Sequence, residues 1–89
     1  MMYPYLTLAD GTEIVHSGLM KCGEKTCVEV HFERPKWEGF DSARCVLPDY
    51  QWLFNNGFSA EEIQFFEEFL HHNAHLLFKY AETGGIQIA

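Results

Sequence analysis

The chain has 89 residues, which allows one domain with one core, and its 47% hydrophobic content excludes a disordered segment. A formal net charge of −7, from 13 acidic and 6 basic residues, argues against direct binding to nucleic acid or to an anionic membrane surface, because both depend on clustered Lys and Arg. Aromatic residues make up 16% of the chain. This is more than a small core easily hides, and the surplus favours an interface.

The N-terminal residues 1–5 lack the basic and apolar regions of a signal peptide. No apolar run approaches the ~20 residues that a membrane-spanning helix needs. The three cysteines, an odd number, are Cys22, Cys27 and Cys45. We therefore expect a cytoplasmic protein in which all three thiols are reduced.

The first expected element is a β-hairpin, formed by residues 5–9 and 12–20 around an Asp-Gly dipeptide. A three-residue loop that ends at Gly11 in the left-handed conformation gives the better register, because it keeps the leucines on the same face as the apolar residues opposite them. The facing pairs are then Leu8 with Thr12 and Leu6 with Ile14.

Residues 27–34 alternate between apolar and polar side chains, which predicts a strand with one buried face that ends at Pro35. Its buried residues are expected to be Val28, Val30 and Phe32. Residues 42–47 predict a further strand, whose inward residues are Ala43, Cys45 and Leu47. These strands complete a β-meander over residues 3–48. Residues 49–55 then predict a short helical turn that is closed by Asn-Asn-Gly.

The segment 36–41 between the two strands is expected to be a loop that contains Trp37 and Phe40. Two interpretations remain open for these aromatic residues. The loop has the composition of a recognition site, because aromatic and Arg side chains are enriched at binding hot spots. Alternatively, Trp37 folds down as a lid over one end of the core.

The long helix over residues 59–83 has the clearest sequence signals. Ser59 is the expected N-cap and Glu62 its capping-box partner, while Phe58 and Ile63 form a hydrophobic staple. A Gly-Gly pair ends the helix at the start of a tail over residues 84–89. Within this tail, residues 86–88 are expected either to add a short edge strand or to cap the core. The whole chain is thus predicted to be a single α+β domain with an antiparallel meander of about four strands and one long helix.

Two apolar stripes run along this helix at a spacing of ~100° per residue. The first stripe is expected to pack on the sheet and consists of Ile63, Phe66, Leu70, Ala74, Leu77 and Ala81. The second stripe is the main candidate for an interaction surface and consists of Phe65, Phe69, Leu76 and Tyr80. Monomers rarely expose large apolar patches, so the second stripe is expected to be covered. Within the chain, either the sheet curls around the helix or the segments 37–40 and 50–54 cover the stripe. Alternatively, a second copy of the chain or another protein covers it.

A metal site is the alternative prediction. His71 and His75 lie four residues apart on the polar side of the helix, with Glu68 one turn earlier, and Cys22 and Cys27 bracket a turn. Zinc sites need three or four such ligands from convergent elements. The helix pattern is not His-Glu-x-x-His, and zinc knuckles more often have the spacing Cys-x2-Cys than the Cys-x4-Cys found here.

No catalytic motif is present: the sequence lacks a nucleophile elbow, a phosphate-binding loop and a dinucleotide fingerprint. We therefore expect no enzymatic activity and no cofactor. The leading hypothesis is a non-enzymatic protein–protein interaction module that binds itself as a homodimer or binds another protein. A weaker hypothesis, which rests on net charge alone, is an acidic mimic of nucleic acid that inhibits a basic protein.

Overall fold

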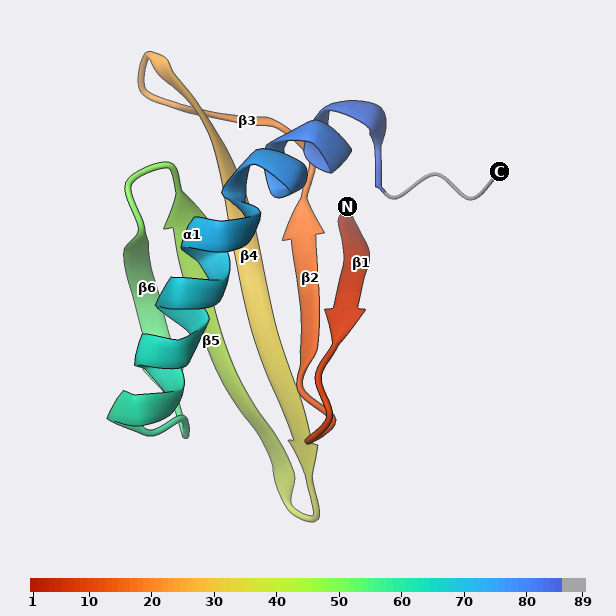
Figure 1. Ribbon diagram of the computed structural model, residues 1–89, viewed down its shortest axis with the longest axis vertical. Helices are drawn as coiled ribbons and strands as arrows, with labels where there is room; N and C mark the ends of the chain where they lie inside the picture. The colour runs from red at the N-terminus through yellow and green to blue at the C-terminus, as the bar shows by residue number, and fades with distance from the viewer. Residues whose placement is uncertain (86–89) are drawn as a thin grey trace.

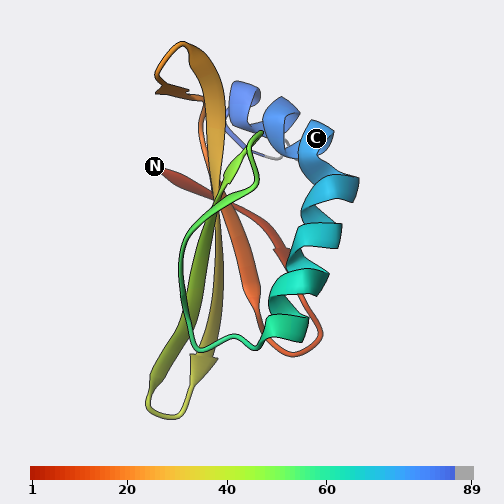
Figure 2. The same ribbon diagram turned by 90° about the vertical axis from the view of Figure 1, so that its left-hand side faces the viewer.

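The computed structural model describes residues 1–85 and shows an α+β fold of two layers. Six antiparallel strands form the sheet, in the order β1-β2-β4-β5-β6, with β3 paired to β4. One helix, α1, runs diagonally across the sheet (Figure 1). Viewed from the side, α1 covers one face, and β3 lies toward the other (Figure 2). The elements are β1 (Met2–Thr7), β2 (Glu13–Ser17), β3 (Met20–Cys22), β4 (Lys25–Lys36), β5 (Gly39–Leu47), β6 (Gln51–Asn56) and α1 (Ala60–Thr83).

The β1–β2 hairpin has the predicted register. Leu6 lies opposite Ile14, the Leu8 N–H donates to the Thr12 carbonyl at 2.8 Å, and Gly11 has a φ of 90°. The register shifts between Pro4 and Leu6, so that Tyr5 is a bulge residue. The Tyr5 hydroxyl donates to Asn73 Oδ1 of α1 at 2.7 Å, which ties this edge of the sheet to the helix.

The core lies between α1 and the central strands. The predicted inward residues of β4 and β5 are all buried, with at most 2% of their surface exposed. From the helix, four residues of the predicted first stripe are buried: Phe66, Leu70, Leu77 and Ala81. Ile63 and Ala74 are partly buried against them. The rings of Phe32 and Phe66 stack with their centroids 4.2 Å apart, which joins the two layers at the centre.

Both ends of the helix agree with the sequence prediction. Ser59 is the N-cap, and its hydroxyl accepts the Glu62 N–H while the Glu62 carboxylate accepts the Ser59 N–H. Gly84 has a φ of 81°, the left-handed conformation that Gly adopts without steric cost, and its N–H bonds to the Tyr80 carbonyl.

The prediction of a helical turn over residues 49–55 is wrong, because Gln51–Asn56 form strand β6 against β5. The Asn55 side chain accepts the Phe58 N–H and donates to the Phe58 carbonyl. Asn55 therefore closes the turn that leads into α1, instead of ending a helical turn. The chain reverses at residues 48–50, where Tyr50 has a φ of 54°.

The expected loop over residues 36–41 is also wrong in its bounds. Strand β4 continues to Lys36 and β5 begins at Gly39, so the two strands form one long hairpin. Pro35 does not end β4. The pairing of β2 with β4 stops at Glu33, so Pro35 has a neighbouring strand on one side and needs no N–H donor on the other. The expected role of residues 86–88 lies outside the described residues.

Candidate interaction surfaces

The second helix stripe is largely covered within the chain, by the edge of the sheet and not by the segments 37–40 and 50–54. Phe69, Leu76 and Tyr80 are partly buried. The Tyr5 ring contacts Phe69 edge-on at a centroid distance of 6.0 Å and Tyr80 at 6.1 Å. The cover therefore comes from β1, where the bulge directs Tyr5 onto the helix.

The segment over residues 50–54 packs along the opposite flank of the helix. The Tyr50 ring stacks on His71 at a centroid distance of 3.9 Å. The Trp52 indole donates to the Glu67 carboxylate at 3.1 Å. This segment therefore packs along one flank of α1, where His71 itself stays exposed.

Phe65 is the member of the second stripe that remains exposed, with 53% of its surface accessible. It lines a groove of about 540 Å³ between the β1–β2 turn and the first turn of α1. Apolar side chains and carboxylates both line the groove; its residues are Leu8, Ala9, Asp10, Glu61, Glu62, Phe65 and Phe66.

A charge cluster around Arg34 fixes the position of this groove. The Arg34 guanidinium contacts Asp41 at 2.7 Å, Asp10 at 3.2 Å and also Glu62, and it lies 4.8 Å from the centroid of the Phe58 ring. The hydrogen bond from Arg34 is the main cause of a lowered pKa for Glu62. Lys36 and then Arg34 lower the pKa of Asp41. The cluster thus joins the β1–β2 turn, the long hairpin and the start of α1 by ion pairs.

The tip of the β4–β5 hairpin, which we call the hairpin arm (residues 35–40), extends past the N-terminal end of α1 (Figure 1). Trp37 is 100% exposed and Phe40 is 60% exposed. The interpretation of Trp37 as a lid is therefore wrong. The two strands of the hairpin continue to pair as far as Lys36 and Gly39, which holds Trp37 away from the core.

The face of the sheet that turns away from α1 has a row of polar contacts that the sequence did not identify as a site. His31 Nε2 lies 2.8 Å from the Glu29 carboxylate. Arg44 Nε lies 3.1 Å from Glu29, close enough for an ion pair but without the alignment of a hydrogen bond. The Arg44 guanidinium also lies 5.2 Å from the centroid of the Phe54 ring. The alternation of Glu29 and His31 along β4 was the available signal.

The residues of the alternative metal site are not brought together. Cys22 and Cys27 form a disulfide, which corrects the prediction of three reduced thiols. They occupy diagonal positions on β3 and β4, since Cys22 faces Lys25 and Cys27 faces Met20. Residues 1–85 contain no group of three or more His, Cys, Asp or Glu residues placed to hold a metal ion, and the set with Glu68, His71 and His75 is included in that finding.

Cys45 is the free cysteine, and it is buried on the core face of β5 as predicted. Burial raises the pKa of its thiol to about 12. The thiolate, which is the nucleophilic form, is therefore scarcely populated at neutral pH. Cys45 is a packing residue of the core.

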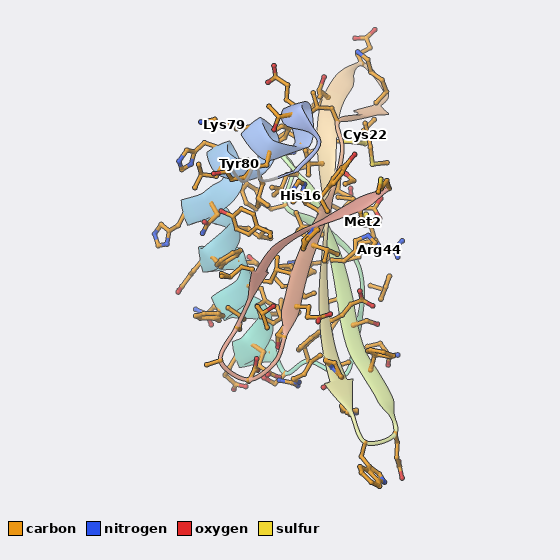
Figure 3. All side chains as sticks on the ribbon, turned by 90° about the vertical axis from the view of Figure 1, so that its right-hand side faces the viewer. Met2, His16, Cys22, Arg44, Lys79 and Tyr80 are labelled. Carbon is orange, nitrogen blue, oxygen red and sulfur yellow. A yellow bond between two sulfur atoms is a disulfide. The ribbon has the colours of Figure 1, made fainter. Side chains whose placement is uncertain are left out.

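A buried histidine was missed by the sequence interpretation. His16 is 0% exposed, and it lies on the helix side of the sheet below the last turns of α1 (Figure 3). Its Nδ1 is 2.9 Å from the Ser17 carbonyl, and since a carbonyl only accepts, Nδ1 holds the proton. Nε2 has no hydrogen-bond partner among the described residues. In the sequence, the signal for this burial was that His16 lies two residues after Ile14 on β2, and therefore on the same face of the strand.

Comparison with known proteins gives no relationship: no family model, curated protein or solved structure matches this chain. Within residues 1–85, α1 does not combine the length and apolar character needed to cross a membrane.

Proposed function

We propose that this domain is a non-enzymatic protein–protein interaction module and that the hairpin arm is its contact site for another protein. The observation that supports this most is the full exposure of Trp37. Trp has a large apolar surface that is buried in most folded proteins, and it is the residue type most enriched at binding hot spots.

The surroundings of Trp37 suit a binding site. Phe40 on the same arm is 60% exposed, and Lys36 forms an ion pair with Asp41 at 2.9 Å at the base of the arm. Two paired strands hold the arm, so its conformation is largely set before binding, and less conformational entropy is lost on association. A partner with an apolar pocket would bury both aromatic side chains at once.

A photo-crosslinking experiment tests this proposal. Benzoylphenylalanine is placed at Trp37, and in a matched control at Lys79, which is exposed on α1. We expect position 37 to give a defined covalent adduct with one protein in the cells that produce the chain, and position 79 to give none. The purified partner is then used for affinity measurements.

Substitution of the arm residues gives the quantitative part of the test. Trp37→Ala is expected to weaken binding of the purified partner by more than about tenfold, the range of a hot-spot residue. The melting temperature should not change, because the fully exposed Trp37 side chain has no packing to lose. Unchanged affinity in the Trp37→Ala and Phe40→Ala variants would refute the assignment of the arm.

A further inference from the structure

Strand β6 is an edge of the sheet with little protection against pairing. It is the last strand in the order β1-β2-β4-β5-β6, and it lies at the margin of the sheet in Figure 1. Its sequence, Gln-Trp-Leu-Phe-Asn-Asn, contains no charged residue and no proline. Leu53 is 49% exposed and Phe54 is 42% exposed. Natural proteins usually protect such edges with charges, prolines or covering segments, because an open edge is a template for another strand.

The opposite edge of the same sheet provides the comparison. Strand β1 includes Pro4, which has no N–H to offer a further strand. The chain that leaves the helix packs on β1 as well: a Cβ on Gly85 would lie 3.1 Å from the Tyr3 ring. Each edge strand has one register irregularity, which in β6 falls at Leu53. Strand β1 is therefore protected by three features and β6 by one.

We propose that β6 pairs antiparallel with β6 of a second copy of this chain, so that one sheet continues through the dimer. A two-fold axis places the same segment of both copies face to face, so the segment must be complementary to itself. In the centred register each residue pairs with a neutral partner of similar character. A two-fold axis between antiparallel strands passes between a residue and its own copy, so this register is centred on Leu53: the cross-strand pairs are Leu53 with Leu53, Trp52 with Phe54, and Gln51 with Asn55.

Charge favours this surface over most others on the molecule. Each copy has a net charge of −7, so contacts through most surfaces bring acidic side chains together. Like charges opposite each other destabilise a strand pair, and the centred β6 pair contains none. The remaining repulsion between the two chains is long-range and screened by salt, which predicts that added salt strengthens the dimer.

The size of the contact sets the expected strength. Six residues of strand span about 20 Å. The surface buried by one pair of strands this short is below the ~800 Å² per partner of a standard stable interface. The dimer is therefore expected to be reversible, with association that depends on protein concentration.

Two leucines of similar exposure make a matched test. Leu53 lies on β6 and is 49% exposed, while Leu6 lies on β1 and is 45% exposed. Sedimentation velocity is measured from about 10 µM to about 1 mM, the range for weak interfaces, at low and high salt. We expect wild-type protein and Leu6→Lys to shift from monomer toward dimer, more so at high salt. Leu53→Lys should stay monomeric throughout, with an unchanged circular dichroism spectrum.

Amide hydrogen exchange on the wild-type protein supplies a second measurement that needs no variant. Amides of β6 should exchange more slowly at high than at low protein concentration, and amides of β1 should not change. A wild-type protein that remains monomeric at about 1 mM in high salt overturns the proposal. So does equal loss of dimer in Leu6→Lys and Leu53→Lys. Trp37→Ala should dimerise normally, which separates this surface from the hairpin arm.

Discussion

The Tyr5 hydroxyl and the Asn73 side chain form a hydrogen bond of 2.7 Å between residues 68 positions apart in sequence. Asn73 also donates to the Phe69 carbonyl one turn earlier at 2.8 Å, so its amide is held in position for Tyr5. Burial raises the pKa of the Tyr5 phenol above its ordinary value of 10.0, which keeps it a donor at neutral pH. This bond and the ring contacts of Tyr5 attach the β1–β2 hairpin to the second stripe of the helix.

Two neighbouring members of the second stripe, Phe65 and Phe69, should respond differently to a charge. Phe69→Glu places a carboxylate under the Tyr5 ring in a partly buried contact, and we expect a loss of about 2–4 kcal/mol in the free energy of unfolding. Phe65→Glu changes a side chain that is 53% exposed, and we expect a loss below about 1 kcal/mol. Urea melts of both variants make the comparison. Equal losses would mean that Tyr5 does not cover Phe69 in solution.

The capping box predicts a second pair of variants. Ser59→Ala removes the oxygen that accepts the Glu62 N–H, and we expect a loss of about 0.5–2 kcal/mol in the free energy of unfolding. Ser59→Asp keeps an acceptor at the N-cap and should stay within a few tenths of a kcal/mol of wild type. If both variants lose the same amount in urea melts, the loss does not come from the N-cap bond.

The disulfide should contribute modestly to stability, because it closes a short loop. With a sequence separation of 5 between Cys22 and Cys27, the loop-entropy relation gives about 2 kcal/mol. Reduction with dithiothreitol should lower the free energy of unfolding by this amount and leave the fold intact. Under denaturing conditions without reductant, alkylation should modify one thiol per chain, Cys45. Modification of three thiols would contradict the disulfide.

Local sequence patterns predict the parts of this fold that depend on neighbours in sequence. The inward residues of β4 and β5 follow from strict alternation, and both helix ends follow from their caps. Strand β6 was not predicted, because its assignment depends on pairing with β5. Trp52 faces inward to Phe32, at a centroid distance of 5.7 Å, while Leu53 and Phe54 both stay exposed across a register shift. That shift removes the alternation by which a strand is recognised.

The candidate surfaces were less predictable, for the same reason. The second stripe is visible in the sequence, but what covers it is Tyr5, whose orientation depends on a bulge in β1. The exposure of Trp37 depends on how far β4 and β5 continue to pair beyond Glu33. Neither is a property of a single segment, so alternation and composition could not decide between a lid and an exposed arm.

The Arg34 cluster predicts how stability depends on pH. The pKa of Asp10 is lowered mainly by the Thr12 N–H and further by Arg34, and Arg34 is the main cause of the lowered pKa of Glu62. When a folded pKa is lower than the unfolded one, the unfolded chain binds more protons as the pH falls. The stabilisation by Glu62 is therefore complete above its ordinary pKa of 4.5 and is lost as the pH falls through the lowered value.

Arg34→Gln removes the cation and should bring these carboxylate pKa values back toward their ordinary range. The variant should be less stable at neutral pH, because Asp41 is 3% exposed and loses one of its two cationic partners. The drop in its free energy of unfolding between about pH 5 and about pH 3 should be smaller than in wild type, since fewer protons are taken up on unfolding. Lys25→Gln is the matched control, because its ion pair with Asp49 is highly exposed on both sides and contributes little. Urea melts at a series of pH values measure both slopes, and a wild-type slope in Arg34→Gln would mean that the cluster does not form in solution.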